Sequence, residues 1–311
     1  WDNKDVISAV GYLAKTEKID KVVPLSECDI IYVDKINEHF QLKPIFDFKF
    51  TDLLKLRNYL FDAGLLVPEY IHALNFDEIE DFIKAGSFPL LLKPRFRGLY
   101  FKLKKCYNSE ELWGYLNRIG DLTSYYLIER FINGVTYHVD SLLYNGKIQH
   151  SLVSQYGFSP VQSIPHGRVF TSKTVLKNTV DEQNILQLNK QVLKTINFTT
   201  GIVHVEIIKS DITGRYFITS IIPHIADEYL SEMFFAATGI NLWKEWAMLI
   251  INGKGTSDII KPQQYAGLIF SDTWQEQPLL EDYDDDEIKH KIVGKNQAAI
   301  ILASDNYNKI T

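Results

Sequence analysis

A histidine and a glutamate alternate along one predicted strand, and they are the residues with the clearest capacity for chemistry. His204 and Glu206 lie two positions apart within Gly201–Ser210, so both side chains face the same side of that strand. The turn-forming run Asp211–Gly214 follows, and a second strand, Arg215–Pro223, then returns. Imidazole and carboxylate groups on one wall of a hairpin can bind a metal ion.

The second strand of the hairpin is expected to place other side chains on the same face. By the same period of two, Ser220, Ile222 and His224 share one face of that strand and its exit. We expect Glu206 to have no second carboxylate within coordinating distance, which leaves His204 and His224 as further ligands. Two imidazoles and one carboxylate suit Zn²⁺ better than Mg²⁺. The alternative is structural: His224 hydrogen-bonds neighbouring backbone, and Glu206 pairs with a lysine or with water.

Composition excludes several classes of function. The 311 residues are 46% hydrophobic and 23% charged, which is ordinary for a globular protein with two or three packed lobes. A formal net charge of −6 argues against a nucleic-acid binder. The sequence shows no signal peptide and no apolar run of the roughly 20 residues that a membrane span needs, so we expect a cytoplasmic protein without membrane contact. Cys28 and Cys106 lack metal or redox spacing and are expected to be unpaired thiols.

Hydrophobic periodicity and turn residues predict alternating helices and strands along the chain. Before residue 71 the expected order is a helix, the buried strand Ile19–Leu25, a helix opened by Ser26 and Asp29, the helix Phe50–Gly64, and the strand Leu65–Pro68. The remaining expected helices are Asp77–Ala85, Val180–Asn197, Asp227–Gly239 and Asn241–Asn252. The remaining expected strands are Phe88–Pro94, Tyr126–Glu129, Tyr137–Leu143 after a turn at Gly134, Lys147–Tyr156, Ala266–Ile269 and Ala298–Leu302.

Three loops carry charged or histidine residues. Arg95–Lys102 continues into two further lysines and is basic enough to attract an anion, although a solvated hairpin face is the simpler interpretation. In the connection Gly157–Thr171, His166 and Arg168 are the functional candidates. The alternative is that they are simply exposed loop residues. The acidic run Glu281–Glu287 lacks the spacing and central glycine of an EF-hand loop, which favours a solvated loop.

The hairpin resembles the metal-binding hairpin of the ATP-grasp ligases. In that family the second strand usually reads Ile-Glu-Ile-Asn-Pro-Arg, and its Glu and Asn hold magnesium together with a Glu of the first strand. With Pro223 setting the register, Glu206 keeps the first ligand position. Ser220, Ile222 and His224 stand where the family has Glu, Asn and Arg.

Two upstream segments resemble the family's nucleotide-binding parts. Lys93, at the end of its strand, corresponds to the lysine that contacts the α- and β-phosphates. The glycine-rich loop that should follow retains Gly98, with Tyr100 and Lys102 where small residues are expected. Asp52 and Arg57 match a family helix in which Leu53 replaces a lysine. Lys55 is either a nearby substitute for that lysine or a solvated lysine.

A further segment resembles the linker whose backbone binds adenine in the family. It consists of Glu129, Arg130, Phe131 and Ile132, and it is followed by Thr136 in place of the ribose-binding glutamate.

The resemblance implies an α/β fold with α+β lobes. The expected ATP-grasp architecture is a truncated open parallel-sheet N-terminal domain, followed by two α+β lobes with the nucleotide cleft between them. The corresponding domains are residues 1–70 (N-terminal), 71–133 (small lobe) and 134–311 (large lobe and C-terminal segment).

Three functions follow from how much of the motif set is retained. Family ligases transfer a phosphoryl group to a carboxylate, and an amine then attacks the acylphosphate; magnesium supports the transfer. Because most of these positions are replaced, the first hypothesis is a degenerate protein that binds ATP and Mg²⁺ weakly and acts as a partner subunit, in a homodimer or heteromer, or as a nucleotide- or anion-binding module. The alternative is an active amino-acid or peptide ligase for a small carboxylate and an amine, with catalysis by shifted residues such as Lys55, Lys102 and His224. The third is a different metal-dependent chemistry at His204, Glu206 and His224.

Overall fold

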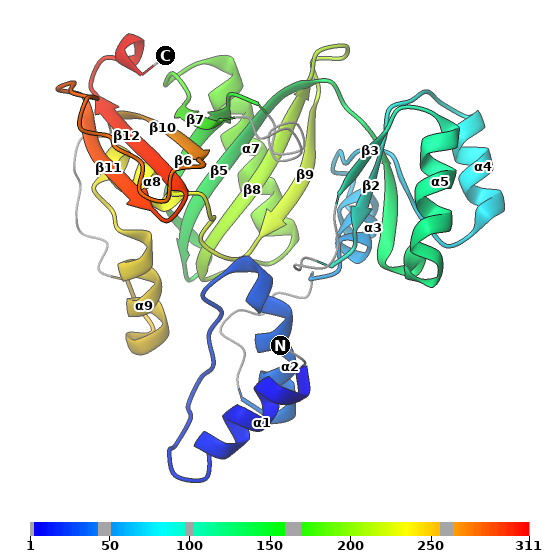
Figure 1. Ribbon diagram of the computed structural model, residues 1–311, viewed down its shortest axis with the longest axis horizontal. Coiled ribbons are helices and arrows are strands. Elements are labelled where there is room, and N and C mark those ends of the chain that lie inside the picture. Colours follow the sequence, from blue (N-terminus) through cyan, green and yellow to red (C-terminus); the bar gives the residue numbers. More distant parts are fainter. Residues whose placement is uncertain (1–2, 43–50, 97–102, 159–168, 256–263, 311) are drawn as a thin grey trace. The chain divides into compact units, whose positions relative to one another are not determined.

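The computed structural model divides the chain into two units (Figure 1). Unit 1 comprises Trp1–Asp62 and Glu69–Phe131, and unit 2 comprises Ala63–Pro68 and Ile132–Thr311. The structure describes residues 3–42, 51–96, 103–158, 169–255 and 264–310. The three-domain division expected from the sequence stays a prediction.

Unit 1 contains a four-stranded antiparallel sheet in the order β1-β4-β2-β3. Leu90, Leu92, Ile128 and Cys106 from these strands join side chains of two helices in one core. The helices and strands of unit 1 are α1 Asn3–Leu13, η1 Glu27–Asp29, α2 Ile30–His39, α3 Leu53–Asp62, β1 Tyr70–His72, α4 Phe76–Lys84, β2 Leu90–Pro94, β3 Lys104–Cys106, α5 Ser109–Ile119, η2 Gly120–Tyr125 and β4 Tyr126–Arg130.

Helix starts in unit 1 follow from local side-chain chemistry. The Asn75 side chain accepts hydrogen bonds from the backbone N–H groups of Asp77 and Glu78, which caps α4. The predicted start at Ser26 and Asp29 is confirmed, because the Ser26 N–H donates to the Asp29 carboxylate and η1 leads into α2. The predicted helices at residues 50–64 and 77–85 are also confirmed as α3 and α4.

Two predicted strands were wrong. Ile19–Leu25 and Leu65–Pro68 form no strand. A strand needs a neighbour that takes up its backbone N–H and C=O groups along its length. Ile19–Leu25 joins neither of the two sheets in the described part of the chain. At Leu66 the carbonyl accepts one backbone hydrogen bond from Ile218, which does not make a ladder.

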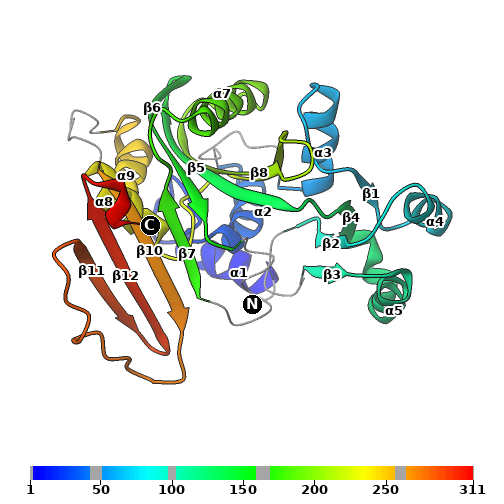
Figure 2. The ribbon, with the colours of Figure 1, turned by 90° about the horizontal axis from the view of Figure 1, so that it is seen from above.

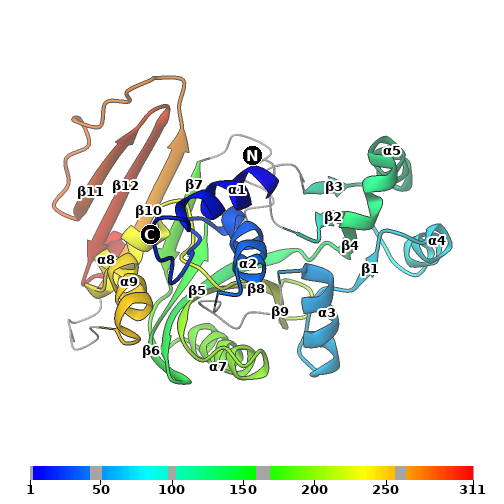
Figure 3. The ribbon, with the colours of Figure 1, turned by 90° about the horizontal axis from the view of Figure 1, so that it is seen from below.

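Unit 2 is built on an eight-stranded antiparallel sheet in the order β11-β12-β10-β7-β6-β5-β8-β9 (Figure 2). Helix α7 packs on β5 and β6, and α8 packs on β10 and β12 (Figure 3). The helices and strands of unit 2 are β5 Gly134–Tyr144, β6 Lys147–Tyr156, β7 Phe170–Thr174, α7 Val180–Thr195, β8 Gly201–Ser210, β9 Tyr216–Ile222, α8 Leu230–Thr238, α9 Leu242–Asn252, β10 Tyr265–Asp272, β11 Ile288–Gly294, β12 Gln297–Ser304 and η4 Tyr307–Lys309.

Most predicted elements of unit 2 are confirmed, including the Asn145-Gly146 turn, where both residues have positive φ values of 50° and 73°. The expected turn at Gly134 was wrong, because β5 already begins there. Strand β11 was not predicted: it is an edge strand whose lysines and His290 are exposed, so it lacks the alternation of a half-buried strand. Among the described residues, every helix is too short or too polar to cross a lipid bilayer.

The start of β5 lies very close to β8. A Cβ atom added at Gly134 would overlap the backbone carbonyl oxygen of Lys209, which cannot move without breaking the ladder between the two strands. Glycine is therefore required here by the approach of two backbones.

We expect Gly134→Ala to lower the free energy of unfolding by about 1–3 kcal/mol, as overpacking at a rigid site typically does. Chemical denaturation with circular dichroism measures it. The matched control is Gly114→Ala in α5, where an added Cβ meets nothing within 4 Å; this change should stabilise by up to about 1 kcal/mol through helix propensity. Equal effects of the two substitutions would contradict the interpretation.

Candidate functional site

The hairpin of β8 and β9 closes in the predicted register. Glu206 pairs with Ser220, and His204 pairs with Ile222, in an antiparallel ladder with a bulge between Glu206 and Ile207. Residues directly opposite in such a ladder place their side chains on the same face of the sheet. A serine and an isoleucine therefore lie beside the histidine and the glutamate, as expected from strand parity.

The other neighbour of β8 contributes two residues that sequence reasoning missed. On β5, His138 pairs with Glu206, and Asp140 pairs with His204. His138-Val-Asp140 has the same imidazole-x-carboxylate spacing as His204-Val-Glu206, so the period-of-two pattern could have found it.

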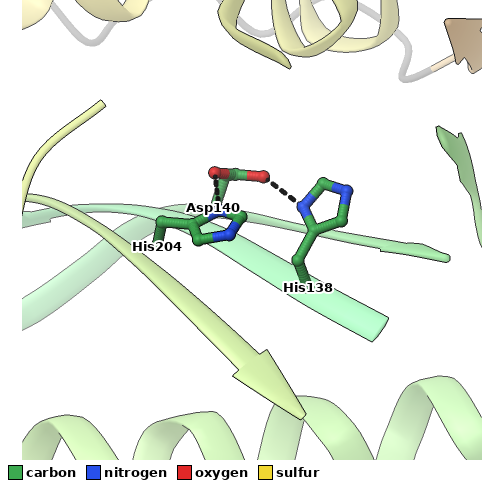
Figure 4. Close-up of side chains that lie close together, drawn as sticks. All are labelled: His138, Asp140 and His204. Atoms are coloured by element: carbon green, nitrogen blue, oxygen red, sulfur yellow. Dashed lines mark hydrogen bonds and ion pairs between the residues drawn. The ribbon is translucent and has the colours of Figure 1, made fainter. Parts of the chain in front are cut away.

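Asp140 bridges two imidazoles in the interior of unit 2 (Figure 4). The Nδ1 atom of His138 lies 2.7 Å from Asp140 Oδ2, and Nδ1 of His204 lies 2.8 Å from Asp140 Oδ1. All three residues are buried, with at most 3% of their surface exposed. Both Nδ1 atoms donate a proton to Asp140, because a carboxylate can only accept.

The second nitrogen of each imidazole is also held. His138 Nε2 lies 2.7 Å from the Ser172 hydroxyl, and His204 Nε2 lies 3.2 Å from the Tyr156 hydroxyl. The Tyr156 hydroxyl donates to Glu206 Oε1 at 3.3 Å, and its ring stacks on His138 with centroids 4.6 Å apart. Glu206 Oε1 is 3.9 Å from His204 Nε2. Together with Asp140, these side chains form one connected polar network of six residues.

The network shifts the pKa values of the two histidines in opposite directions. Burial opposes the charged form of His204, but Asp140 and Glu206 raise its pKa to about 9. At His138 burial outweighs the pull of Asp140, and the pKa is lowered. Burial also opposes the ionisation of Asp140, but His204 and His138 hold the pKa of that carboxyl well below its ordinary value. His204 therefore carries the positive charge that balances Asp140 at neutral pH.

His224 lies apart from this network. Its Nδ1 donates to the Ile225 carbonyl at 2.8 Å, and its ring packs edge-on against Trp243 and Trp246. This confirms the structural alternative for the His224 hydrogen bond. Among the described residues, the histidines and acids that could contact one ion together are His138, Asp140 and His204, so the predicted His204–Glu206–His224 set is not the group that the structure brings together.

Unit 1 contains a second buried charge cluster, at the residues that resemble the nucleotide-binding parts. Lys93 Nζ lies 2.7 Å from Glu129 Oε2, and Arg57 Nε lies 2.5 Å from Glu129 Oε1. Both Arg57 and Glu129 are fully buried. Burial would raise the pKa of Glu129, but Arg57 and Lys93 hold it below its ordinary value. The predicted phosphate lysine thus forms an ion pair within its own unit.

The predicted adenine-binding segment forms backbone hydrogen bonds of its own. The N–H groups of Arg130 and Phe131 donate to the carbonyls of Glu69 and Pro89 at 2.9 and 3.2 Å. Ile132 begins the second segment of unit 2, and Thr136 is buried on β5. Their ligand-binding roles stay predictions.

The basic loop is described in part. Arg95 forms an ion pair with Asp52, with its Nη2 2.5 Å from Oδ2, and Lys55 is exposed on α3. Residues predicted from this loop and from the later connection lie outside the described residues: Arg97, Gly98, Tyr100, Lys102, His166 and Arg168.

This chain resembles known proteins more clearly in fold than in sequence. No family profile matches the sequence. Over 214 residues, 66% of this chain, the sequence is 23% identical to the carbamoyl phosphate synthase large chain of Saccharolobus islandicus, and the match spans only 19% of that relative. The L-amino acid ligase of Bacillus licheniformis superposes on 99% of this chain and 81% of its own, with a TM-score of 0.76 at 17% identity.

The chain has the ATP-grasp fold.

Two further ATP-grasp structures agree with this assignment. The N5-carboxyaminoimidazole ribonucleotide synthetase of Thermus thermophilus covers 98% of this chain and 82% of its own, with a TM-score of 0.73 at 13% identity. The biotin carboxylase domain of the Hydrogenobacter thermophilus 2-oxoglutarate carboxylase, a dimer with MgADP and bicarbonate, covers 98% of this chain and 74% of its own, with a TM-score of 0.71 at 12% identity. The predicted ATP-grasp fold is confirmed.

The ion cluster of unit 1 makes a testable energetic prediction. We expect Glu129→Gln to lower the free energy of unfolding by about 3–5 kcal/mol, because it leaves the buried Arg57 without its carboxylate. Urea denaturation measures it. Glu80→Gln is the control, since it removes an ion pair to Lys84 whose members are both more than half exposed, and should cost less than about 1 kcal/mol. A small effect at Glu129 would show that the pair contributes little.

The protonation of the two histidines gives a second prediction. At pH 7 in chelator-treated protein, His204 should be protonated on both nitrogens and His138 neutral. Because the pKa of His204 is raised by folding, its contribution to stability is full below pH 6.5 and is lost as the pH rises through about 9. Nitrogen-15 NMR of the imidazoles measures both states. Glu206→Gln should lower the pKa of His204, and a neutral His204 at pH 7 would contradict the prediction.

Proposed function

We propose that this ATP-grasp protein does not form acylphosphates and instead acts as a partner subunit or as a nucleotide- or anion-binding module. The observation that carries the proposal is the pairing of Glu206 with Ser220. In the resembling ligases the position opposite the first metal glutamate is a second glutamate. Here the opposite residue is a hydroxyl, and the next position on that face is the buried Ile222.

The residues at the hairpin do not fit the family's magnesium site. Mg²⁺ requires near-octahedral oxygen coordination and is usually held by one or two carboxylates together with substrate phosphates. Of the side chains at the three ligand positions, Glu206 offers a carboxylate, Ser220 offers a neutral hydroxyl, and Ile222 offers no ligand. The Glu206 carboxylate also accepts from the Tyr156 hydroxyl. Magnesium coordination of the family type is therefore not part of the proposed function.

The ion pair at Lys93 supports weak nucleotide affinity. A phosphate oxygen that approaches Lys93 must share its ammonium with Glu129, 2.7 Å away. A buried, ionised carboxylate competes strongly for a neighbouring cation. Arg57, Lys93 and Glu129 together still carry one net positive charge, which supports retention of some affinity for an anion.

The decisive experiment is calorimetry with Mg-ATP. We expect no binding in the low-micromolar range, because losing each charge-assisted hydrogen bond costs about 1.5–3 kcal/mol and two or three such losses reduce affinity by several orders of magnitude. Ser220→Glu, which restores the second carboxylate, should increase affinity for Mg-ATP, whereas Thr213→Glu in the hairpin turn, away from the paired positions, should not.

Low-micromolar Mg-ATP binding by the wild-type protein, with ADP release in the presence of amino acids, would replace the proposal with an active ligase. Light scattering tests the proposed role as a partner subunit. A stable dimer or a recovered heteromeric complex is expected of a partner subunit, and a clean monomer with no nucleotide or anion affinity would contradict both roles.

A further inference from the structure

The network in unit 2 has the composition and geometry of a transition-metal site. One ligand atom from each of His138, Asp140 and His204 can be chosen so that all three lie within 4.8 Å of one another. They come from adjacent strands of one sheet, so the ladder between β5 and β8 fixes their relative positions. Two imidazoles and one carboxylate are a donor set of catalytic zinc sites and of non-haem iron sites.

The ligand atoms must move slightly apart to admit an ion. The two Nδ1 atoms lie 2.7 and 2.8 Å from the Asp140 oxygens. Zinc binds histidine nitrogen at about 2.0–2.1 Å and carboxylate oxygen at about 2.0–2.2 Å, so tetrahedral ligands are about 3.3 Å apart. Separating each pair by about half an ångström therefore opens a coordination site. The Nδ1 proton of His204 would be released to solvent on binding, and the proton of neutral His138 would move from Nδ1 to Nε2, which then donates to the Ser172 hydroxyl.

The outer nitrogens are already in the arrangement that a metal-binding histidine needs. Such a histidine coordinates through one ring nitrogen while the other is held by a hydroxyl, carbonyl or carboxylate, which fixes the ring. His138 Nε2 contacts the Ser172 hydroxyl, and His204 Nε2 contacts the Tyr156 hydroxyl. The Tyr156 ring stacks on His138 and limits its rotation. Both imidazoles are therefore oriented without using Nδ1.

We propose that His138, Asp140 and His204 bind a zinc ion as its three protein ligands. Zn²⁺ fits this set better than Mg²⁺ or Ca²⁺, which prefer six or more oxygen ligands. The site goes beyond the proposed function, because none of the three ligands is a hairpin position that holds magnesium in the resembling ligases, and binding requires no nucleotide.

Metal titration of the full chain tests the proposal. Protein stripped with EDTA is titrated with ZnSO₄ in a calorimeter without nucleotide, and with CoCl₂ while its visible spectrum is recorded. We expect one equivalent of zinc per chain, a rise in the melting temperature with zinc, and an intense cobalt absorption band typical of tetrahedral coordination. Zinc binding that is absent or far below one equivalent would overturn the proposal.

Substitutions assign the ligands. Asp140→Asn and His138→Gln should each weaken zinc binding by more than the roughly 10–100-fold that loss of an outer-shell partner costs. His224→Gln, a buried imidazole outside the network, and His290→Gln, an exposed one on β11, should leave affinity unchanged. Circular dichroism and melting without metal identify variants that fail to fold. If Asp140→Asn unfolds, Ser172→Ala takes its place; it removes the hydroxyl at His138 Nε2 and should weaken zinc binding by about 10–100-fold.

The set of variants that lose zinc affinity decides whether the ligand assignment is right. Retention of full affinity in folded Asp140→Asn and His138→Gln, or loss of affinity in His224→Gln or His290→Gln, would overturn the assignment. Since these titrations contain no ATP, failure of the zinc site leaves the Mg-ATP measurement unaffected, and tight Mg-ATP binding leaves the zinc result unaffected.

Discussion

Each unit of this protein contains a buried carboxylate that lies between two basic side chains. An unpaired ionised carboxylate in a protein interior is very costly. Asp140 lies between two imidazoles in unit 2, and Glu129 lies between Arg57 and Lys93 in unit 1. The partners come from different elements, so each cluster can form only when those elements meet in the observed register.

Fold and chemistry depend on different features of this chain. The ATP-grasp framework requires strand pairing and core packing, which the sequence retains. Phosphoryl transfer requires particular side chains at a few positions, and Ser220 can replace a glutamate without disturbing the ladder. In unit 1 the lysine that resembles the phosphate ligand persists as a partner of Glu129. A retained residue type is therefore weak evidence for a retained role.

Local signals predicted much of the fold. The Asn145-Gly146 turn, the helix start at Ser26 and the period of two in β8 are properties of short segments, and each predicted its element. The cap at Asn75 is a signal of the same kind and agrees with the start of α4. Tertiary pairing decided the rest. Ile19–Leu25 joins neither sheet in the described part of the chain, although it resembles a short buried strand, and the exposed strand β11 pairs without an apolar pattern. His138 and Asp140 were overlooked because their significance depends on a residue 64 positions away in the sequence.

The bulge in the hairpin determines which side chains meet. From Lys209 and Tyr216 near the turn, regular one-to-one counting would place Thr219 opposite Glu206. The extra residue at the bulge instead brings Ser220 to that position and shifts every later pair by one. Because neighbouring residues face opposite sides of a sheet, this single insertion exchanges the two faces of β9 between its two halves. The hairpin thus has two registers, one from the turn to the pair Ile207–Ile218 and one from Glu206–Ser220 to His204–Ile222, and only the second puts the Ser220 hydroxyl opposite the glutamate.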